Sequence, residues 1–127
     1  MPAPNIKGGM IEYVAPAERW TATASATVTG GQVVRLTGNR AVGPCGVGQF
    51  PVGIASHDAA AGEVVTVVSS GIVPLKAAGA IAAGDPVITA AAGAVAADVT
   101  APDAAVMVGR AMEAIADLAT GRVKLGL

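Results

Sequence analysis

The sequence is poor in aromatic residues, in charge, in cysteine and in histidine, and each shortage narrows what the chain can do. Of its 127 residues, 2% are aromatic and 13% are charged, and the formal net charge is -1. We do not expect nucleic-acid binding, because the chain has no run of basic residues to meet phosphates and few rings to stack on bases. Cys45 is the one cysteine, so an internal disulfide is excluded.

Long uninterrupted apolar runs are also missing. The longest stretch without a formal charge, residues 41–57, contains Pro44, Pro51 and several glycines, so it does not suit a membrane-spanning helix. The first 20 residues carry four charged side chains where a secretory signal needs an apolar segment. We therefore expect neither a membrane partner nor a signal peptide.

Small apolar residues, chiefly alanine and valine, dominate what is present, and hydrophobic residues make up 53% of the chain. The length suits one domain with one core. A monomer with so little charge exposes apolar surface, which often marks an interface. Burial by copies of the chain or by a larger assembly is one explanation, and a general enrichment in alanine is the other. The composition leaves both open.

The first 20 residues differ from the rest, since they hold three of the eight prolines and the residues Tyr13 and Trp20. They sustain no helical or alternating period, which predicts an extended arm over residues 1–20, with a short strand around Met10–Val14, ahead of a β-domain over residues 21–127. Scarce aromatic residues in an arm are candidate anchors on a partner. For Trp20 the alternative is that it closes the bottom of the domain's own core.

Beyond the arm, short strands alternate with glycine-rich turns. Residues 21–28 alternate hydroxyl and small apolar side chains, the period of a half-buried strand. The pattern predicts an all-β fold, a small β-barrel or β-sandwich of short antiparallel strands. Residues 38–50 are expected to form a loop, and the spacing within residues 109–120 also allows one helical turn. The expected strands are residues 21–28, 32–37, 52–56, 64–69, 71–75, 86–89, 94–97, 105–114 (a strand or a strand-helix hybrid) and 122–125.

One short unit, a glycine and a polar residue followed by a strand, recurs along the chain. A longer pair is also visible: the sequence VGIA at residues 52–55 leads to GEVVTV, and VGRA at residues 108–111 leads to GRVKL. This pattern predicts two related hairpin units that close one barrel or sandwich. The short unit begins at Gly31, Gly62, Gly84 and Gly121.

A catalytic or metal-binding set is not recognisable. Ser56, His57 and Asp58 are adjacent, so on a strand their side chains point to alternate faces and form no triad among themselves. No helix follows Cys45 to lower its pKa, and one cysteine and one histidine do not make a zinc site. No phosphate-binding glycine loop is present either. We therefore predict no catalytic residue, no cofactor and no metal.

The order of the motifs carries a family likeness across residues 28–127. The VGIA strand, the alanine-rich turn with its GE pair, the strand GEVVTVV, the IAAGDPV turn, the late VGRA and the final GRVKL resemble, in this order, the capsid cement (head decoration) proteins of tailed bacteriophages. The resemblance implies a non-enzymatic protein on the outer surface of the virion, made in the host cytoplasm. It also implies that the protein bridges major capsid protein subunits, stabilises the shell, and self-associates as a homotrimer, with a dimer as the alternative.

The arm is the expected contact with the capsid partner, because an extended segment can add a strand to an exposed sheet edge. The residues assigned to this contact are Met10, Ile11, Tyr13 and Trp20. A small carbohydrate- or ligand-binding β-domain is the alternative function, although few aromatic residues and only two asparagines are available for a sugar site. An enzyme that uses Ser56, His57 or Cys45 is a third, weaker hypothesis.

Overall fold

The computed structural model describes residues 18–98 and 104–126, and these residues form strands joined by turns and two short 3-10 segments. The strands are β1 (Arg19–Ala24), β2 (Val33–Gly38), β3 (Ala41–Pro44), β4 (Gly53–Ala55), β5 (Val64–Val68), β6 (Ile72–Lys76), β7 (Pro86–Thr89), β8 (Val95–Ala97), β9 (Met107–Ala111) and β10 (Thr120–Leu125), and the 3-10 segments are η2 (Ala91–Gly93) and η3 (Ala104–Val106). The predicted all-β fold is confirmed.

The first five strands close into a barrel in the order β1-β3-β2-β4-β5. β1 pairs antiparallel with β5 along its length and closes the barrel by a short parallel contact with β3. The inward positions carry alanine and valine, such as Val34, Val42 and Val65, which are fully buried. Small β-branched side chains suit this narrow interior, because they pack well on a pleated surface.

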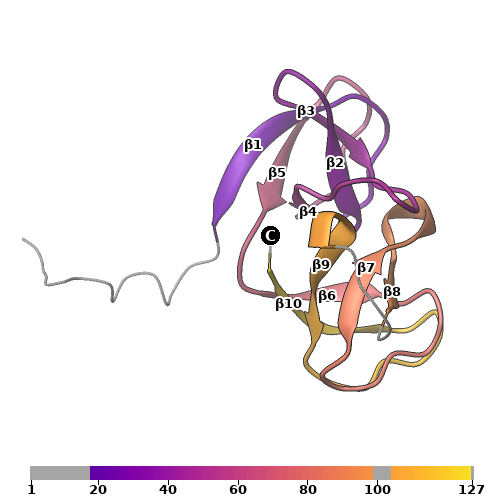
Figure 1. Cartoon of the computed structure of the whole chain (residues 1–127). Helices are drawn as coiled ribbons and strands as arrows, with labels where there is room; N and C mark the ends of the chain where they lie inside the picture. The colour runs from indigo at the N-terminus through magenta and orange to yellow at the C-terminus, as the bar shows by residue number, and fades with distance from the viewer. Residues whose placement is uncertain (1–17, 99–103, 127) are drawn as a thin grey trace, which may run out of the picture.

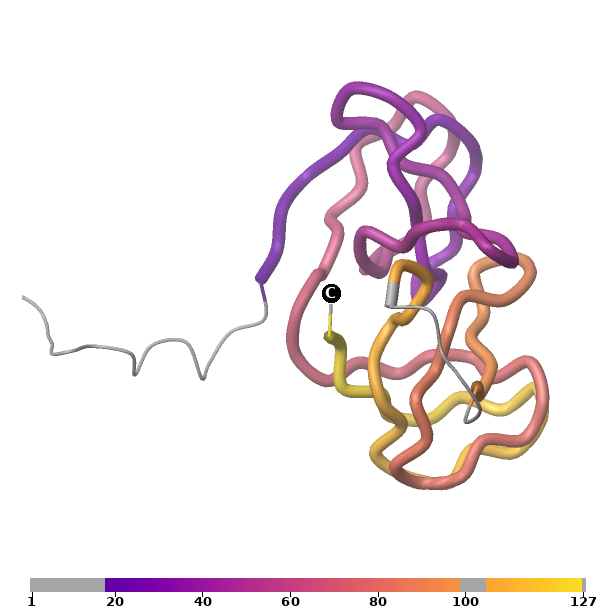
Figure 2. The backbone as a smooth tube through the Cα atoms, viewed as in Figure 1, coloured from indigo at the N-terminus to yellow at the C-terminus, as the bar shows by residue number. Residues whose placement is uncertain are grey.

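The last five strands form an antiparallel sheet in the order β6-β10-β9-β7-β8. An isolated parallel bridge between Ala77 and Val95 joins the two ends of this sheet. In Figures 1 and 2 the two five-stranded units, β1–β5 and β6–β10, lie one above the other, with the chain crossing once between β5 and β6.

The second unit repeats the first strand by strand. In both units the first strand pairs with the fifth, the second with the third and fourth, and the fourth with the fifth. The isolated bridge between Val28 and Ala59 has its counterpart between Ile81 and Ile115. The two predicted hairpins are therefore confirmed as β4–β5 and β9–β10, but they belong to separate sheets and do not close one barrel together.

A close approach of backbones explains why the VGIA and VGRA motifs share a glycine. A Cβ atom on Gly53 would lie 2.8 Å from the carbonyl oxygen of Val68, and one on Gly109 would clash with the carbonyl oxygen of Lys124. Only glycine lets the fourth strand of each unit lie this close to the fifth. The VGIA and VGRA motifs therefore share a glycine because the same close contact between strands occurs in both units.

One of the two apolar clusters in the structure spans both units. Val33, Cys45, Ile54 and Val68 of the first unit pack with second-unit residues that include Leu75. Each such side chain contributes roughly 1.5–3 kcal/mol when it is fully buried. The shared cluster fastens the units into one body.

Three local expectations differ from the structure. The loop predicted over residues 38–50 contains β3, because the glycine and proline of the sequence AVGP resemble a loop although this segment forms a hairpin with β2. No helical turn forms within the described part of residues 109–120, where a bend, an isolated bridge and a turn follow β9. β1 begins at Arg19, so the last two residues of the predicted arm belong to the barrel.

Candidate functional site

The segment Ser56–Asp58 secures a turn and holds no triad. The backbone N–H of Thr66 donates to Nε2 of His57 at 3.2 Å, so the ring proton lies on Nδ1, 3.0 Å from the carbonyl oxygen of Asp58. The carboxylate of Asp58 accepts the N–H of Gly30 at 2.8 Å. Both side chains thus serve backbone groups.

Cys45 is a core residue. It is buried, and burial raises the pKa of its thiol above the ordinary value, although nearby Arg35 acts in the opposite direction. The Sγ atom lies 3.5 Å from the carbonyl oxygen of Gln49, to which the protonated thiol donates. A buried neutral thiol is a poor nucleophile.

Residues 18–98 and 104–126 contain neither a metal-binding cluster nor a helix that could span a membrane. No group of three or more histidine, cysteine, aspartate or glutamate side chains gathers there as a metal site would require. No helix in this part of the chain has the length and apolar character needed to cross a bilayer.

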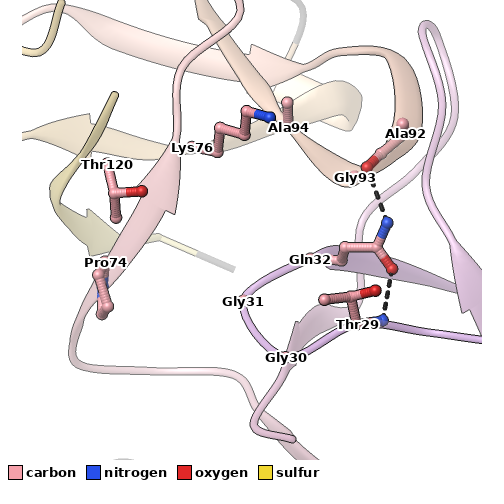
Figure 3. Close-up of a pocket in the computed structure, with 10 residues that line it drawn as sticks. All are labelled: Thr29, Gly30, Gly31, Gln32, Pro74, Lys76, Ala92, Gly93, Ala94 and Thr120. Atoms are coloured by element: carbon pink, nitrogen blue, oxygen red, sulfur yellow. Dashed lines mark hydrogen bonds between the residues drawn. The ribbon is translucent and has the colours of Figure 1, made fainter. Parts of the chain in front are cut away.

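A groove of about 470 Å³ runs between the two units (Figure 3). Gln32 spans it: its Nε2 donates to the carbonyl oxygen of Ala92 at 3.0 Å, and its Oε1 accepts the N–H of Thr29 at 2.8 Å. Lys76 is the one charged residue among the ten that line the groove, and none is aromatic. The Gln32 side chain therefore links the two units across the groove. The groove has no aromatic side chain on which a sugar could stack.

The predicted contact residues fall in two regions. Met10, Ile11 and Tyr13 lie outside the described residues. Trp20 lies in β1, pairs with Val67 of β5, is half-buried and packs against the core cluster of the first unit. The alternative assigned to Trp20, a role in closing the core, agrees with this packing.

Large apolar side chains remain exposed on the described surface, and two of them line one hollow. Leu36 of β2 and Phe50 of the β3–β4 loop line a hollow of about 270 Å³ together with Arg35, Gly48 and Gln49, and Val47 precedes Gly48 in the same loop. We call Arg35, Leu36, Val47 and Phe50 the Phe50 face. This face is not among the contacts predicted from the sequence, although a signal was present: the one phenylalanine of the chain stands in a glycine-rich loop.

Comparisons with known proteins agree with the structural role. The solved head fiber gp8.5 N base of bacteriophage phi29 shares the fold, with 17% sequence identity and a TM-score of 0.68 over 87% of this chain and 95% of that one. No curated protein sequence matches the chain. The model of a family described as phage cement protein matches residues 14–127. The chain therefore belongs to the phage cement protein family and is a non-enzymatic structural component of the phage head.

Proposed function

We propose that this protein binds the outer surface of the phage head, bridges neighbouring major capsid protein subunits and stabilises the shell. The observation that carries the proposal is the match of the phage cement family to residues 14–127. The proposal includes a position on the outer capsid surface, reached after synthesis in the host cytoplasm.

The architecture supports a bridging role. A protein that holds two subunits together needs a body that does not deform under load and more than one contact surface. The two units share a buried apolar cluster and are further tied by the Gln32 side chain, so a force applied to one unit passes to the other. Each unit presents its own exposed apolar side chains, among them Phe50 in the first and Ile72 in the second.

The low charge of the chain indicates which forces hold it on the shell. With 13% charged residues and a net charge of -1, the protein has little long-range field to steer it to the shell. Its attachment rests on apolar burial and hydrogen bonds. We therefore expect the affinity for the shell to change little between low and moderate salt.

We assign Met10, Ile11, Tyr13 and Trp20 to the capsid contact and propose a homotrimer, with a dimer as the alternative. Several linked arms would bind the shell more tightly than one arm, because the second contact becomes intramolecular.

Binding to bare shells tests the function. Shells assembled without the protein are titrated with purified protein, and bound protein is measured after sedimentation of the shells. We expect saturable binding and a higher temperature of shell disruption in calorimetry. Absence of binding, or binding that leaves the disruption temperature unchanged, would overturn the proposal. A cryo-EM map of decorated shells then gives the positions occupied and the number of copies at each.

A further inference from the structure

The β3–β4 loop that carries Val47 and Phe50 is held in place from several sides. The side-chain Oε1 of Gln49 accepts the N–H of Gly46 at 2.7 Å, and the N–H of Gln49 donates to the carbonyl oxygen of Gly46 at 3.1 Å. The carbonyl oxygen of Gln49 accepts from the Cys45 thiol at 3.5 Å and from the Thr89 hydroxyl at 3.1 Å. Because Thr89 belongs to β7, the second unit braces a loop of the first.

This braced loop displays its apolar side chains to solvent. Val47 is 75% exposed, Phe50 is 66% exposed and nearby Leu36 is 52% exposed. Exposed apolar side chains on a fixed loop are suited to binding, because little conformational entropy remains to be lost when a partner covers them. A phenylalanine in such a position is a candidate for the dominant contact of an interface.

Arg35, beside this hollow, has an unfilled hydrogen-bonding capacity. Its Nε atom is buried from solvent and has no hydrogen-bond partner among the described residues. A buried donor without an acceptor is unfavourable. A partner does not reach the buried Nε, but Arg35 lines the hollow and gives it a positive charge, so a partner that offers a carbonyl or carboxylate oxygen there is favoured.

The second unit has no equivalent of this face. Val34 of β2 pairs with Gly53, and Val87 of β7 pairs with Gly109, so Val34 and Val87 occupy equivalent positions. Two residues further along each strand, Leu36 therefore corresponds to Thr89. Thr89 is buried, and its hydroxyl is used to hold the opposite loop. The fold that the two units share therefore does not require an exposed leucine at the position of Leu36. The Phe50 face is a feature of the first unit.

We propose that the Phe50 face is the docking surface of the folded body on the capsid shell. Its partner is a site on the shell protein that offers an apolar side chain to Phe50 and Leu36 and an oxygen acceptor to Arg35. A second copy of the chain bound through the same face is disfavoured, because the contact would then contain two Arg35 cations and no carboxylate from this face to pair with them. This inference rests on the proposed function, whose failure the test below detects separately.

The test uses the full chain and shells assembled without it. Phe50→Ala should weaken binding to the shell at least tenfold, and Val47→Asp should do the same by placing a charge at the contact. Met112→Ala is the matched control: Met112 is 50% exposed on the second unit, and its loss should change the affinity less than twofold. Thermal unfolding midpoints within about two degrees of the parent, as expected for exposed residues, show that all three variants fold.

The outcomes separate the two proposals. No binding by the parent protein contradicts the proposed function. Binding by the parent together with unchanged affinity in both folded variants, Phe50→Ala and Val47→Asp, overturns the docking surface and leaves the function intact. A lower molar mass of free Phe50→Ala in light scattering, relative to the parent, would identify the face as a contact between copies and would also overturn it.

Discussion

His57 and Glu113 occupy equivalent positions in the two units and perform the same task. His57 accepts the backbone N–H of Thr66 in β5, and Glu113 accepts that of Arg122 in β10 at 2.9 Å. The two acceptors differ in chemistry, an imidazole nitrogen and a carboxylate oxygen, while the backbone N–H groups that donate to them correspond. The lone histidine is therefore one version of a structural acceptor that recurs in each unit.

This equivalence predicts how substitutions at His57 behave. His57→Ala leaves the Thr66 N–H to water and should lower the free energy of unfolding by about 0.5–1 kcal/mol, whereas His57→Glu should lower it by less than about 0.5 kcal/mol. Glu113→Ala is the matched control and should cost about as much as His57→Ala. Urea unfolding at neutral pH measures all three, and a Glu variant as unstable as the Ala variant would refute the shared role.

The glycines of the VGIA and VGRA motifs should tolerate no side chain. Gly53→Ala and Gly109→Ala push a Cβ against the backbone of the neighbouring strand, and each should lower the free energy of unfolding by about 2–3 kcal/mol. Gly38→Ala is the matched control, since its Cβ would lie 3.8 Å from that of Ala41, an ordinary contact. Calorimetric midpoints are the readout. Equal midpoints for Gly38→Ala and Gly53→Ala would contradict the steric explanation of the repeat.

The strands could be predicted from the sequence more completely than the candidate docking surface. The bounds 86–89 coincide with β7, and the repeated glycine motif identified both hairpins, because these features depend on local turn chemistry and alternation. β3 escaped prediction since its sequence, AVGP, resembles a loop, although the strand forms a hairpin with the preceding β2 and only its contact with β1 is non-local. The exposure of Phe50 is a tertiary property, because a phenylalanine in a glycine-rich loop can equally pack onto a core, and here the neighbouring Gln49 is fixed by hydrogen bonds while Phe50 faces solvent.

Comparison of the two units also predicts that the backbone is strained at Leu118. Leu118 has a φ of 64° and is 68% exposed, and Gly62 stands at the corresponding turn of the first unit with a φ of 92°. The left-handed region costs a residue with a Cβ roughly 1 kcal/mol, and glycine avoids this cost. Leu118→Gly should therefore be about 1 kcal/mol more stable than Leu118→Ala, which loses the same side chain but keeps the strain. Equal stabilities of these two variants in chemical unfolding would argue against strain at this turn.

The buried thiol predicts a pH dependence. Burial raises the pKa of Cys45 from the ordinary value of 9.0, so the folded protein keeps the thiol proton at a pH where the unfolded chain has lost it. The unfolded state then binds fewer protons, and stability falls as the pH rises above about 9. Cys45→Ala, although less stable throughout, should lack this alkaline loss. The free energy of unfolding of both proteins is measured from about pH 8 to about pH 10, a range that brackets the ordinary thiol pKa. Profiles that run parallel for the parent and Cys45→Ala would contradict the assignment.

Removal of the first 17 residues should separate attachment from folding. Glu18 holds the start of β1: its N–H donates to Ser70 Oγ at 2.7 Å, and its carboxylate accepts from the Ser69 hydroxyl at 2.8 Å. A chain that begins just before Glu18 keeps these bonds and should unfold within about two degrees of the parent, while it binds shells more weakly. Trp20→Ala should instead lower the free energy of unfolding by about 2 kcal/mol, because Trp20 packs against the core. Shell affinity that survives the truncation but falls in Phe50→Ala would assign attachment to the folded body and remove the arm from the contact.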